Sequence, residues 1–458
     1  MPKVTLNDML IAKEVRKNRQ DEMRQNNAYP IVSITINMPG QEKDSPILRK
    51  LRDYAVGEIR NQLEVIKEYT SNALTGPEAI LAVKGDAKYI KALAVAIEEQ
   101  YSFTRLLDID VFSNEGQLIS RHESGQKRKC LICNDLAVLC MREGRHNAVE
   151  LSLAVRQLID QFSAYLTRFI SPSAEEIGAL AVEAMLYEVS ASPSPGLVDR
   201  VNNGAHKDMD FYSFMSSTAS LGITMARCAQ AGMMHEGKLS ELLPILRWIG
   251  REGEVAMFSS TYGVNTQKGL LFSLGITAAA AGFSKKLAGK RSPEELLEKV
   301  AEITEGIVER ELKTIRDNKP ITAGEKLYQK YGITGIRGEL EQGIPTVRDI
   351  ALPALRKALT AGLNVNDVLI QTLLEIIANI DDTTVMNRHN PDKMAKLVRP
   401  KVRQVLSIGG MYTDNGRDAV FELDREFICS NISPGGAADL LAVTWFVHRL
   451  TASTVVCV

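Results

Sequence analysis

The pattern of apolar and polar positions predicts alternating strands and helices in the first part of the chain. Ile31–Met38 alternates strictly between apolar and polar residues, which predicts a strand with one buried face. From Leu48 to Ile66 apolar residues recur at spacings of three and four, as on one face of a helix. The run Ala79–Val83 predicts a second strand, and Ala92–Ile97 lies in a second helix.

The next segment predicts a hairpin that completes this part. Leu107–Phe112 and Gln117–Ser120 flank Asn114-Glu115-Gly116, a turn sequence typical of hairpins. The resulting order β-α-β-α-β-β predicts an α/β sandwich of modest size.

Helical periodicity dominates the rest of the chain. It continues through Val149–Phe169 and is interrupted at Ser171-Pro172-Ser173, where Ser173 and Glu176 fit a capping box opening a helix over Ala174–Val189. We therefore expect one domain over residues 1–170 and a larger all-α domain over residues 171–458. Its further helices are expected at Phe211–Ala231, Leu239–Ile249, Lys268–Phe283, Pro293–Asp317, Val347–Ala361, Asn366–Ile380, Pro391–Leu406 and Ala437–Leu450.

Composition narrows the class of protein. A chain of 458 residues exceeds what one core usually serves, and 45% apolar with 24% charged residues is ordinary globular composition. The net charge of −1 gives no general attraction to nucleic acid or to anionic lipid. The longest uncharged stretch, Gly269–Ser284, is too short to span a membrane, and no secretory signal is visible. We expect a cytoplasmic protein without nucleic-acid or membrane partners.

Asp108 and Asp110 are the candidate catalytic pair of the first domain. On a strand, residues two apart point to the same face, so both carboxylates stand side by side while Leu107, Ile109 and Val111 face the core. Their repulsion favours a divalent cation, and such a pair on a strand holds Mg²⁺ in many nucleotidyl-transfer sites. This predicts a nucleotidyltransferase-like domain; the alternative is that both aspartates lie on a solvated face.

A cysteine cluster leaves two interpretations open. Cys130 and Cys133 form a Cys-x₂-Cys motif, and Cys140 and His146 follow. This is half of a zinc site with a compact spacing, or a set of reduced thiols that are partly buried.

Four polar, glycine-containing loops are the candidate site of the helical domain, because helices joined only for packing rarely need such loops. The loops are Ser192–Asp208, Gly263–Gly269, Asp381–Thr384 and Ser433–Asp439. The second precedes a helix and carries Lys268, which suits an anionic phosphate. The third is expected at the C-terminal end of a helix, where carboxylates are unfavourable unless a cation is bound. These loops indicate a metal-dependent enzyme acting on a nucleotide or polyphosphate.

Both parts resemble known families. Lys43-Asp44-Ser45, Arg105–Val111 and Cys130–Cys133 resemble the apo-citrate lyase phosphoribosyl-dephospho-CoA transferases. The second resemblance is to the triphosphoribosyl-dephospho-CoA synthases, and it is carried by Ser192–Asp208, Gly263–Gly269, Gly335–Glu339, Asp382-Thr383 and Asn431–Leu440. Their order along the chain is similar to that of the fused bifunctional enzymes.

The resemblance implies two linked reactions. In the helical domain, the 2′-hydroxyl of 3′-dephospho-CoA attacks the ribose of ATP and adenine leaves. In the α/β domain, a serine of the citrate lyase acyl carrier protein (the γ subunit) attacks the α-phosphate of the product and pyrophosphate leaves. An equivalent pair of reactions serving malonate decarboxylase, or a non-catalytic scaffold that binds an acyl carrier protein, are the alternatives.

The same resemblance assigns expected roles. Asp108 and Asp110 would be catalytic ligands of Mg²⁺, and Asp382 and Asp439 would hold the metal that orders the triphosphate. The general base is left open among Glu183, Asp199, Asp208, Glu339, Asp381, Asp382 and Asp439, and Asp199, Asp208 and Glu339 are taken as catalytic candidates. The expected substrate-binding residues are Lys43, Arg49, Arg105, Arg121, Arg200, His206, Lys207, Asn265, Lys268, Arg337, Gly435 and Gly436.

Two positions depart from the common pattern of the synthase family. Gln267 stands where histidine is usual, which places a proton-transfer role at this position in doubt. Asp381 stands where glycine usually precedes the aspartate, so Asp381 is a weaker ligand candidate than Asp382.

Overall fold

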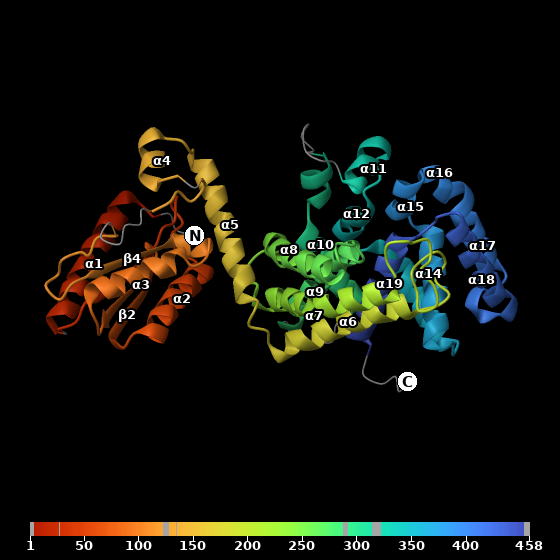
Figure 1. Cartoon of the computed structure of the whole chain (residues 1–458), viewed down its shortest axis with the longest axis horizontal. Helices are drawn as coiled ribbons and strands as arrows, with labels where there is room; N and C mark the ends of the chain where they lie inside the picture. The colour runs from red at the N-terminus through yellow and green to blue at the C-terminus, as the bar shows by residue number, and fades with distance from the viewer. Residues whose placement is uncertain are drawn as a thin grey trace. The chain divides into compact units, whose positions relative to one another are not determined.

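The computed structural model describes residues 4–26, 28–121, 128–133, 135–286, 292–313 and 322–452. The chain divides into two compact units, Met1–Leu166 and Thr167–Val458, which are described separately (Figure 1). Among the described residues, no helix has the length and apolar content that crossing a membrane requires.

The first unit is an α/β fold built on one antiparallel sheet of four strands in the order β2-β3-β1-β4. Its elements in chain order are α1 (Leu6–Asn26), β1 (Ile31–Ile36), α2 (Pro46–Gln62), β2 (Val65–Ala73), β3 (Gly76–Val83), α3 (Ala87–Glu99), a 3₁₀ turn (Phe103–Leu106), β4 (Leu107–Phe112), α4 (Ala137–Glu143) and α5 (Ala148–Leu166).

The two faces of this sheet are covered differently, because side chains alternate along each strand. The main core lies on one face, where Val32, Ile34, Ile109 and their neighbours pack with apolar residues of α2, α3 and α5. On the other face, Met23 of α1 packs in a smaller cluster with residues of β1 and β3. Helices thus lie on both faces of the sheet. On the α1 face, polar side chains lie beside a small apolar cluster.

Two predictions about this unit are wrong. The helix expected to reach Ile66 ends at Gln62, and Val65 begins β2, which pairs with β3 as a hairpin that was not predicted. Gln117–Ser120 does not form a second hairpin strand; only a single bridge joins Phe112 and Leu118. Both predictions failed because the segments are exposed and their sequences lack a clear apolar period. For example, β2 has no buried residue.

The regular secondary structure of the second unit is helical among its described residues. Its α-helices are α6 (Pro172–Ser190), α7 (Phe211–Met234), α8 (Leu242–Ser260), α9 (Lys268–Lys286), α10 (Pro293–Thr304), α11 (Ala323–Tyr331), α12 (Gly335–Glu341), α13 (Leu352–Thr360), α14 (Val365–Asn379), α15 (Thr383–Arg388), α16 (Pro391–Lys393), α17 (Arg399–Ser407), α18 (Asp414–Cys429) and α19 (Gly435–Thr451). Short 3₁₀ or π turns are Leu239–Glu241, Glu309–Lys313, Thr346–Ala351, Met394–Val398 and Gly410–Tyr412.

Helices α6, α7, α9 and α19 form the centre of this unit and pack against one another (Figure 1). Close approach depends on glycine: a Cβ at Gly232 of α7 would meet the carbonyl oxygen of Ala279 in α9 at 1.9 Å. The predicted helices are present in this unit, but with different limits. The last four residues of the predicted helix Pro293–Asp317 lie outside the described residues.

The cap of α6 differs from the prediction. The N-cap is Ser171, whose hydroxyl accepts a hydrogen bond from the backbone N–H of Ala174, and Pro172 occupies the first helical position. A proline at that position requires no hydrogen-bond acceptor, so the helix starts two residues before the predicted capping box. Ser171 also donates to Gln230 of α7 at 2.8 Å, which ties the start of α6 to the centre of the unit.

Candidate functional sites

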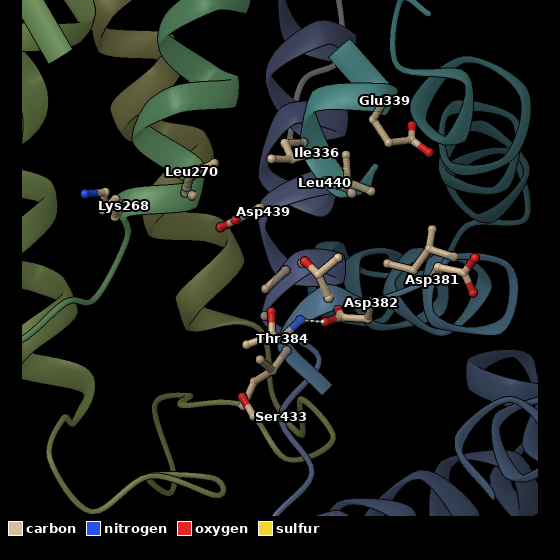
Figure 2. Close-up of a pocket in the computed structure, with 18 of the residues that line it drawn as sticks. Lys268, Leu270, Ile336, Glu339, Asp381, Asp382, Thr384, Ser433, Asp439 and Leu440 are labelled. Atoms are coloured by element: carbon tan, nitrogen blue, oxygen red, sulfur yellow. Dashed lines mark hydrogen bonds between the residues drawn. The ribbon is translucent and has the colours of Figure 1, made fainter. Parts of the chain in front are cut away.

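A cavity of about 840 Å³ lies among the loops of the helical unit (Figure 2). Its walls come from the loop before α7, the start of α9, α12, the segment between α14 and α15, and the start of α19. Segments of all four polar loops noted in the sequence line it, although they are as much as 240 residues apart along the chain. The helical packing thus brings distant polar segments to one place.

Asp382 joins two helix starts at this cavity. It is buried, and it caps α15 because its Oδ1 accepts the backbone N–H of Thr384 at 2.8 Å and of Val385 at 3.1 Å. Its Oδ2 accepts the N–H of Ala437 in the first turn of α19 at 2.9 Å. Burial raises the pKa of Asp382, and these N–H donors oppose that rise because they favour the charged form.

The predicted dipole penalty at Asp382 is therefore wrong. Helix α14 ends at Asn379, and Asp382 interacts with the positive N-terminal ends of α15 and α19 rather than with the negative end of α14. Asp381 lies on the cavity wall, but its carboxylate is paired with Arg399 and is directed away from Asp382 (Figure 2).

Asp439 and Glu188 are the other acidic groups beside Asp382. Asp439 lies in the first turns of α19 and is partly exposed to the cavity, whereas Glu188 is buried near the end of α6. Desolvation raises the pKa of Asp439 well above its usual value, and the charges of Glu188 and Asp382 add to this rise. Burial raises the pKa of Glu188 to about 8. Without a cation, the three carboxylates oppose one another's ionisation.

Basic groups lie on the same walls. Lys268 starts α9 and its ammonium is paired with Glu254 at 2.8 Å, while Asn265 accepts the N–H of Lys268 at 3.2 Å. His206 is bonded to the Ser433 hydroxyl at 2.9 Å, and burial followed by the charge of Arg388 lowers the pKa of His206. Lys268 and Arg388 are therefore the positive groups on the walls around the acidic cluster, whereas the lowered pKa favours a neutral His206.

Gln267 and Thr266 add donors to the wall. The Gln267 side chain is buried, and its Oε1 accepts hydrogen bonds from Ser217 at 2.8 Å and Thr218 at 3.2 Å. Its Nε2 and the Thr266 hydroxyl have no partner among the described residues. Buried donors without partners are rare in proteins, so these two groups are suited to a ligand in the cavity.

The structure brings some predicted residues of this unit together and places others elsewhere. The predicted residues that line the cavity are His206, Asn265, Lys268, Glu339, Asp381, Asp382, Gly435, Gly436 and Asp439. Those that do not line it are Asp199, Arg200, Lys207, Asp208 and Arg337. Asp199 is buried and accepts four hydrogen bonds within its own loop, from Ser192, Ser194, Val201 and Asn202. Arg337 is paired with Glu311 at 2.8 Å, and Arg200 donates to Asn366 at 3.2 Å.

Sequence reasoning missed Glu188 and Arg388 as lining residues. Glu188 follows Ala181, Ala184 and Met185 at helical spacings on the buried face of α6, and a carboxylate within that apolar row was the available signal. Glu183, which was considered instead, lies on another face and bonds Trp445 at 3.0 Å and Arg449. Arg388 had no comparable signal, because its place follows from the packing of α15.

In the first unit, Asp108 and Asp110 share the α1 face of β4, and their neighbours on that strand are buried, as predicted. They pair in register with Thr35 and Ser33 of β1. Arg128 donates to Asp108 at 2.7 Å, and desolvation, followed by the charge of Asp108, raises the pKa of Asp110. Two adjacent carboxylates with a nearby guanidinium form a site that can hold a cation and an anion together.

The predicted phosphate ligands of this unit separate into two groups. Arg105 and Arg121 line a cavity of about 480 Å³ together with Arg128. Arg121 is paired there with Glu98 at 3.0 Å, and Glu98 also accepts the N–H of Ile109 at 2.7 Å. Lys43 and Arg49 lie elsewhere, bonded to the Met38 carbonyl and to Asp44. Arg128 connects this cavity with the aspartate pair.

Comparison with known proteins agrees with the two units. Residues 174–456 match the family described as CitG, ATP:dephospho-CoA triphosphoribosyl transferase. Residues 4–162 match CitX, the apo-citrate lyase phosphoribosyl-dephospho-CoA transferase. A CitXG protein of Leuconostoc mesenteroides is 35% identical over 435 residues, which cover 92% of each chain. The chain belongs to the CitXG family.

Other relatives cover nearly the whole chain or about two thirds of it. CitXG of Haemophilus influenzae is 33% identical over 97% of this chain and 96% of its own. A protein of Malonomonas rubra named as a probable 2-(5″-triphosphoribosyl)-3′-dephosphocoenzyme-A synthase is 39% identical over 67% of this chain and 97% of its own. As a CitXG protein, the chain is a transferase that carries out both steps of citrate lyase prosthetic-group synthesis. Apo-citrate lyase as acceptor implies an acyl carrier protein as partner.

Proposed function

We propose that the 840 Å³ cavity of the helical unit binds ATP and 3′-dephospho-CoA and catalyses transfer of the triphosphoribosyl group, with release of adenine. The observation that carries this assignment is the convergence of Glu188, Asp382 and Asp439 on one cavity within the matched family segment. Displacement of adenine passes through positive charge on the ribose, and carboxylates stabilise such charge.

The start of α19 is the proposed binding site of the triphosphate. The N–H groups of Gly435 and Gly436 have no acceptor among the described residues, and both glycines line the cavity. A helix N-terminus with free N–H groups attracts phosphate oxygens, and the absence of side chains at both positions allows close approach. Lys268 and Arg388 supply charge from the facing walls.

Asp382 and Asp439 are the proposed ligands of Mg²⁺. Their oxygens are hard ligands, Asp382 is fixed by three N–H donors, and Asp439 has no donor among the described residues. Desolvation raises the pKa of both carboxyl groups, and the charge of Asp382 adds to the rise at Asp439. A divalent cation here would favour both charged forms, so the residues present fit the ion. When bound, Mg²⁺ neutralises triphosphate charge.

Glu188 is the proposed general base for the attacking 2′-hydroxyl. It lines the cavity, it has no cationic or hydrogen-bonding partner among the described residues, and its pKa is raised to about 8 by burial. A carboxylate with a pKa near the working pH accepts a proton from a bound hydroxyl efficiently. The hydroxyl oxygen then forms the new bond to the ribose carbon while the bond to adenine breaks.

For the first unit, we propose a nucleotidyltransferase-like site at Asp108 and Asp110. Both carboxylates share one face of β4 and would hold Mg²⁺, while Arg105, Arg121 and Arg128 contact the triphosphate of the intermediate. A serine of the γ subunit of citrate lyase, its acyl carrier protein, attacks the α-phosphate, and pyrophosphate is the leaving group.

Product analysis of the purified full-length protein tests both assignments. With ATP, Mg²⁺ and 3′-dephospho-CoA we expect free adenine, and its absence would reject the role of the helical cavity. Addition of apo carrier protein should then release pyrophosphate and increase the carrier mass. A parallel assay with the carrier protein of malonate decarboxylase tests whether the two reactions serve that enzyme instead. A non-catalytic scaffold would produce neither adenine nor modified carrier.

A further inference from the structure

The four residues of the cysteine cluster come together in the first unit. Cys130, Cys133, Cys140 and His146 each offer one ligand atom, and these atoms all lie within 4.8 Å of one another. Cys133 Sγ lies 3.3 Å from Cys140 Sγ and 3.3 Å from His146 Nε2. With Zn–S bonds of about 2.3 Å, a tetrahedral site places neighbouring ligands about 3.8 Å apart. The cluster therefore has the size of a zinc site without rearrangement of its backbone.

The local backbone supports metal binding. Lys129 and Leu136 form a bridge, and the bonds of Cys130 N–H to Asp135 and of Ala137 N–H to Arg128 close a tight turn that carries the first two cysteines. The N–H of Ile132 points to Cys130 Sγ at 3.4 Å. Such a contact favours a thiolate, which is the form that binds metal.

The segment from residue 128 to 147 has almost no apolar core of its own. Among its described residues, the buried apolar side chains are Cys130 and Cys140, whereas Val138, Leu139 and Met141 of α4 are exposed. In Figure 1, α4 stands apart from the sheet. A seven-residue helix without packing is unstable by itself, so another source of stabilisation is required here.

We propose that Cys130, Cys133, Cys140 and His146 bind one structural Zn²⁺ that folds the segment from residue 128 to 147 and holds Arg128 against Asp108. Four protein ligands of the Cys₃His type close the coordination sphere, as in structural rather than catalytic zinc sites. Thiolates and imidazole select zinc over Mg²⁺ and Ca²⁺, which prefer oxygen.

The proposed ion connects directly to the aspartate pair of β4. Arg128 lies two residues before Cys130 and donates to Asp108 at 2.7 Å and to the Leu107 carbonyl at 2.5 Å. Arg105, in the 3₁₀ turn before that strand, donates to the Cys130 carbonyl. Arg128 is thus a positioning residue whose place depends on the cysteine turn, and this consequence rests on the proposed function of the aspartate pair.

Metal analysis of the full-length protein, purified without chelator or a metal-affinity step, tests the proposal. We expect about one zinc per chain by mass spectrometry, because the described residues form one such cluster. Cys133→Ser and His146→Ala should each lower the zinc content to background, while Cys429→Ser, which removes an exposed cysteine in the helical unit, should leave it unchanged. Replacement of zinc by Co²⁺ in the wild-type protein should give the absorption bands of tetrahedral cobalt with thiolate ligands.

Three results would overturn the proposal: no zinc in wild-type protein after it is offered Zn²⁺, zinc that persists in Cys133→Ser, or a disulfide between Cys133 and Cys140. Adenine release shows whether the helical unit is intact in each variant, and urea unfolding shows whether the first unit, which carries the substitutions in the cluster, is still folded. Absent carrier modification in wild-type protein that contains zinc would count against the aspartate site and not against the metal. Zinc loss with retained adenine release and reduced carrier modification is the expected result for Cys133→Ser.

Discussion

The carboxylate of Asp439 lies directly against the backbone of Gly269, although the two residues are on different helices. A Cβ at position 269 would meet Asp439 Oδ2 at 2.3 Å, so only glycine allows the carboxylate its present position. The start of α9 and the first turns of α19 are therefore fitted to each other at the proposed metal site.

Gly269→Ala should abolish most of the adenine release without unfolding the protein. The added methyl displaces the Asp439 carboxylate, and a displacement of about 1 Å in a catalytic site costs on the order of a hundredfold in rate. Alanine is favoured over glycine in a helix by about 0.5–1 kcal/mol, which offsets the local strain. The matched control is Gly250→Ala in α8, where a Cβ meets no atom within 4 Å. Equal activity in both variants would refute the fitted contact.

Glu188→Gln and Glu183→Gln form a second pair on one helix. Glu188 faces the cavity, and its loss as a base should reduce kcat for adenine release by about 10²–10⁴-fold. Glu183 bonds Trp445 and Arg449 instead, so its replacement should leave kcat near the wild-type value. Steady-state assays that detect adenine measure kcat for both variants. Comparable losses in both variants would show that Glu188 acts through the stability of α6.

The sequence predicted the chemistry of these sites better than their geometry. The alternation around Asp108 and Asp110 determined their common face, because strand geometry is local and their neighbours are apolar. The sequence did not show that Glu188 rather than Glu183 borders the cavity, because the helices packed against α6 determine which of its sides faces the cavity. Asp199 was chosen for its loop, but its four hydrogen bonds became visible only in the folded chain.

Gln267→Glu tests the donor at the cavity wall. Glutamate keeps an acceptor for Ser217 and Thr218 but replaces the unpartnered Nε2 with an anionic oxygen. We expect a loss in kcat/KM of about 1–3 kcal/mol, or roughly five- to 150-fold, because a buried donor to the substrate is lost. The exposed Gln404→Glu adds the same charge outside the cavity and should have no effect. Unchanged kcat/KM in Gln267→Glu would mean that Nε2 does not contact substrate.

His206 should make the stability of the helical unit fall in mild acid. Burial and Arg388 lower its pKa in the folded state below the usual 6.5, so the unfolded chain binds the proton first. Its contribution to stability is therefore complete above about pH 6.5 and is lost as the pH falls from there towards the folded-state pKa, with a slope of at most about 1.4 kcal/mol per pH unit. Urea unfolding of wild-type protein and His206→Gln at several pH values measures the difference. Parallel pH profiles of the two proteins would contradict this prediction. The carboxylate of Asp208, 3.8 Å from His206, opposes the lowering of the His206 pKa.

Asp108→Asn should separate the two activities of the chain. The substitution removes one proposed metal ligand, so carrier modification and pyrophosphate release should fall on the order of a hundredfold or more. The ion pair with Arg128 is partly exposed and contributes at most about 1 kcal/mol, so the first unit should remain folded. Adenine release should stay at the wild-type rate, because the described residues that line the helical cavity all belong to the second unit. Glu115→Gln, an exposed carboxylate of the same unit, is the control. If both activities fell together in a folded Asp108→Asn protein, the assignment of separate sites would be wrong.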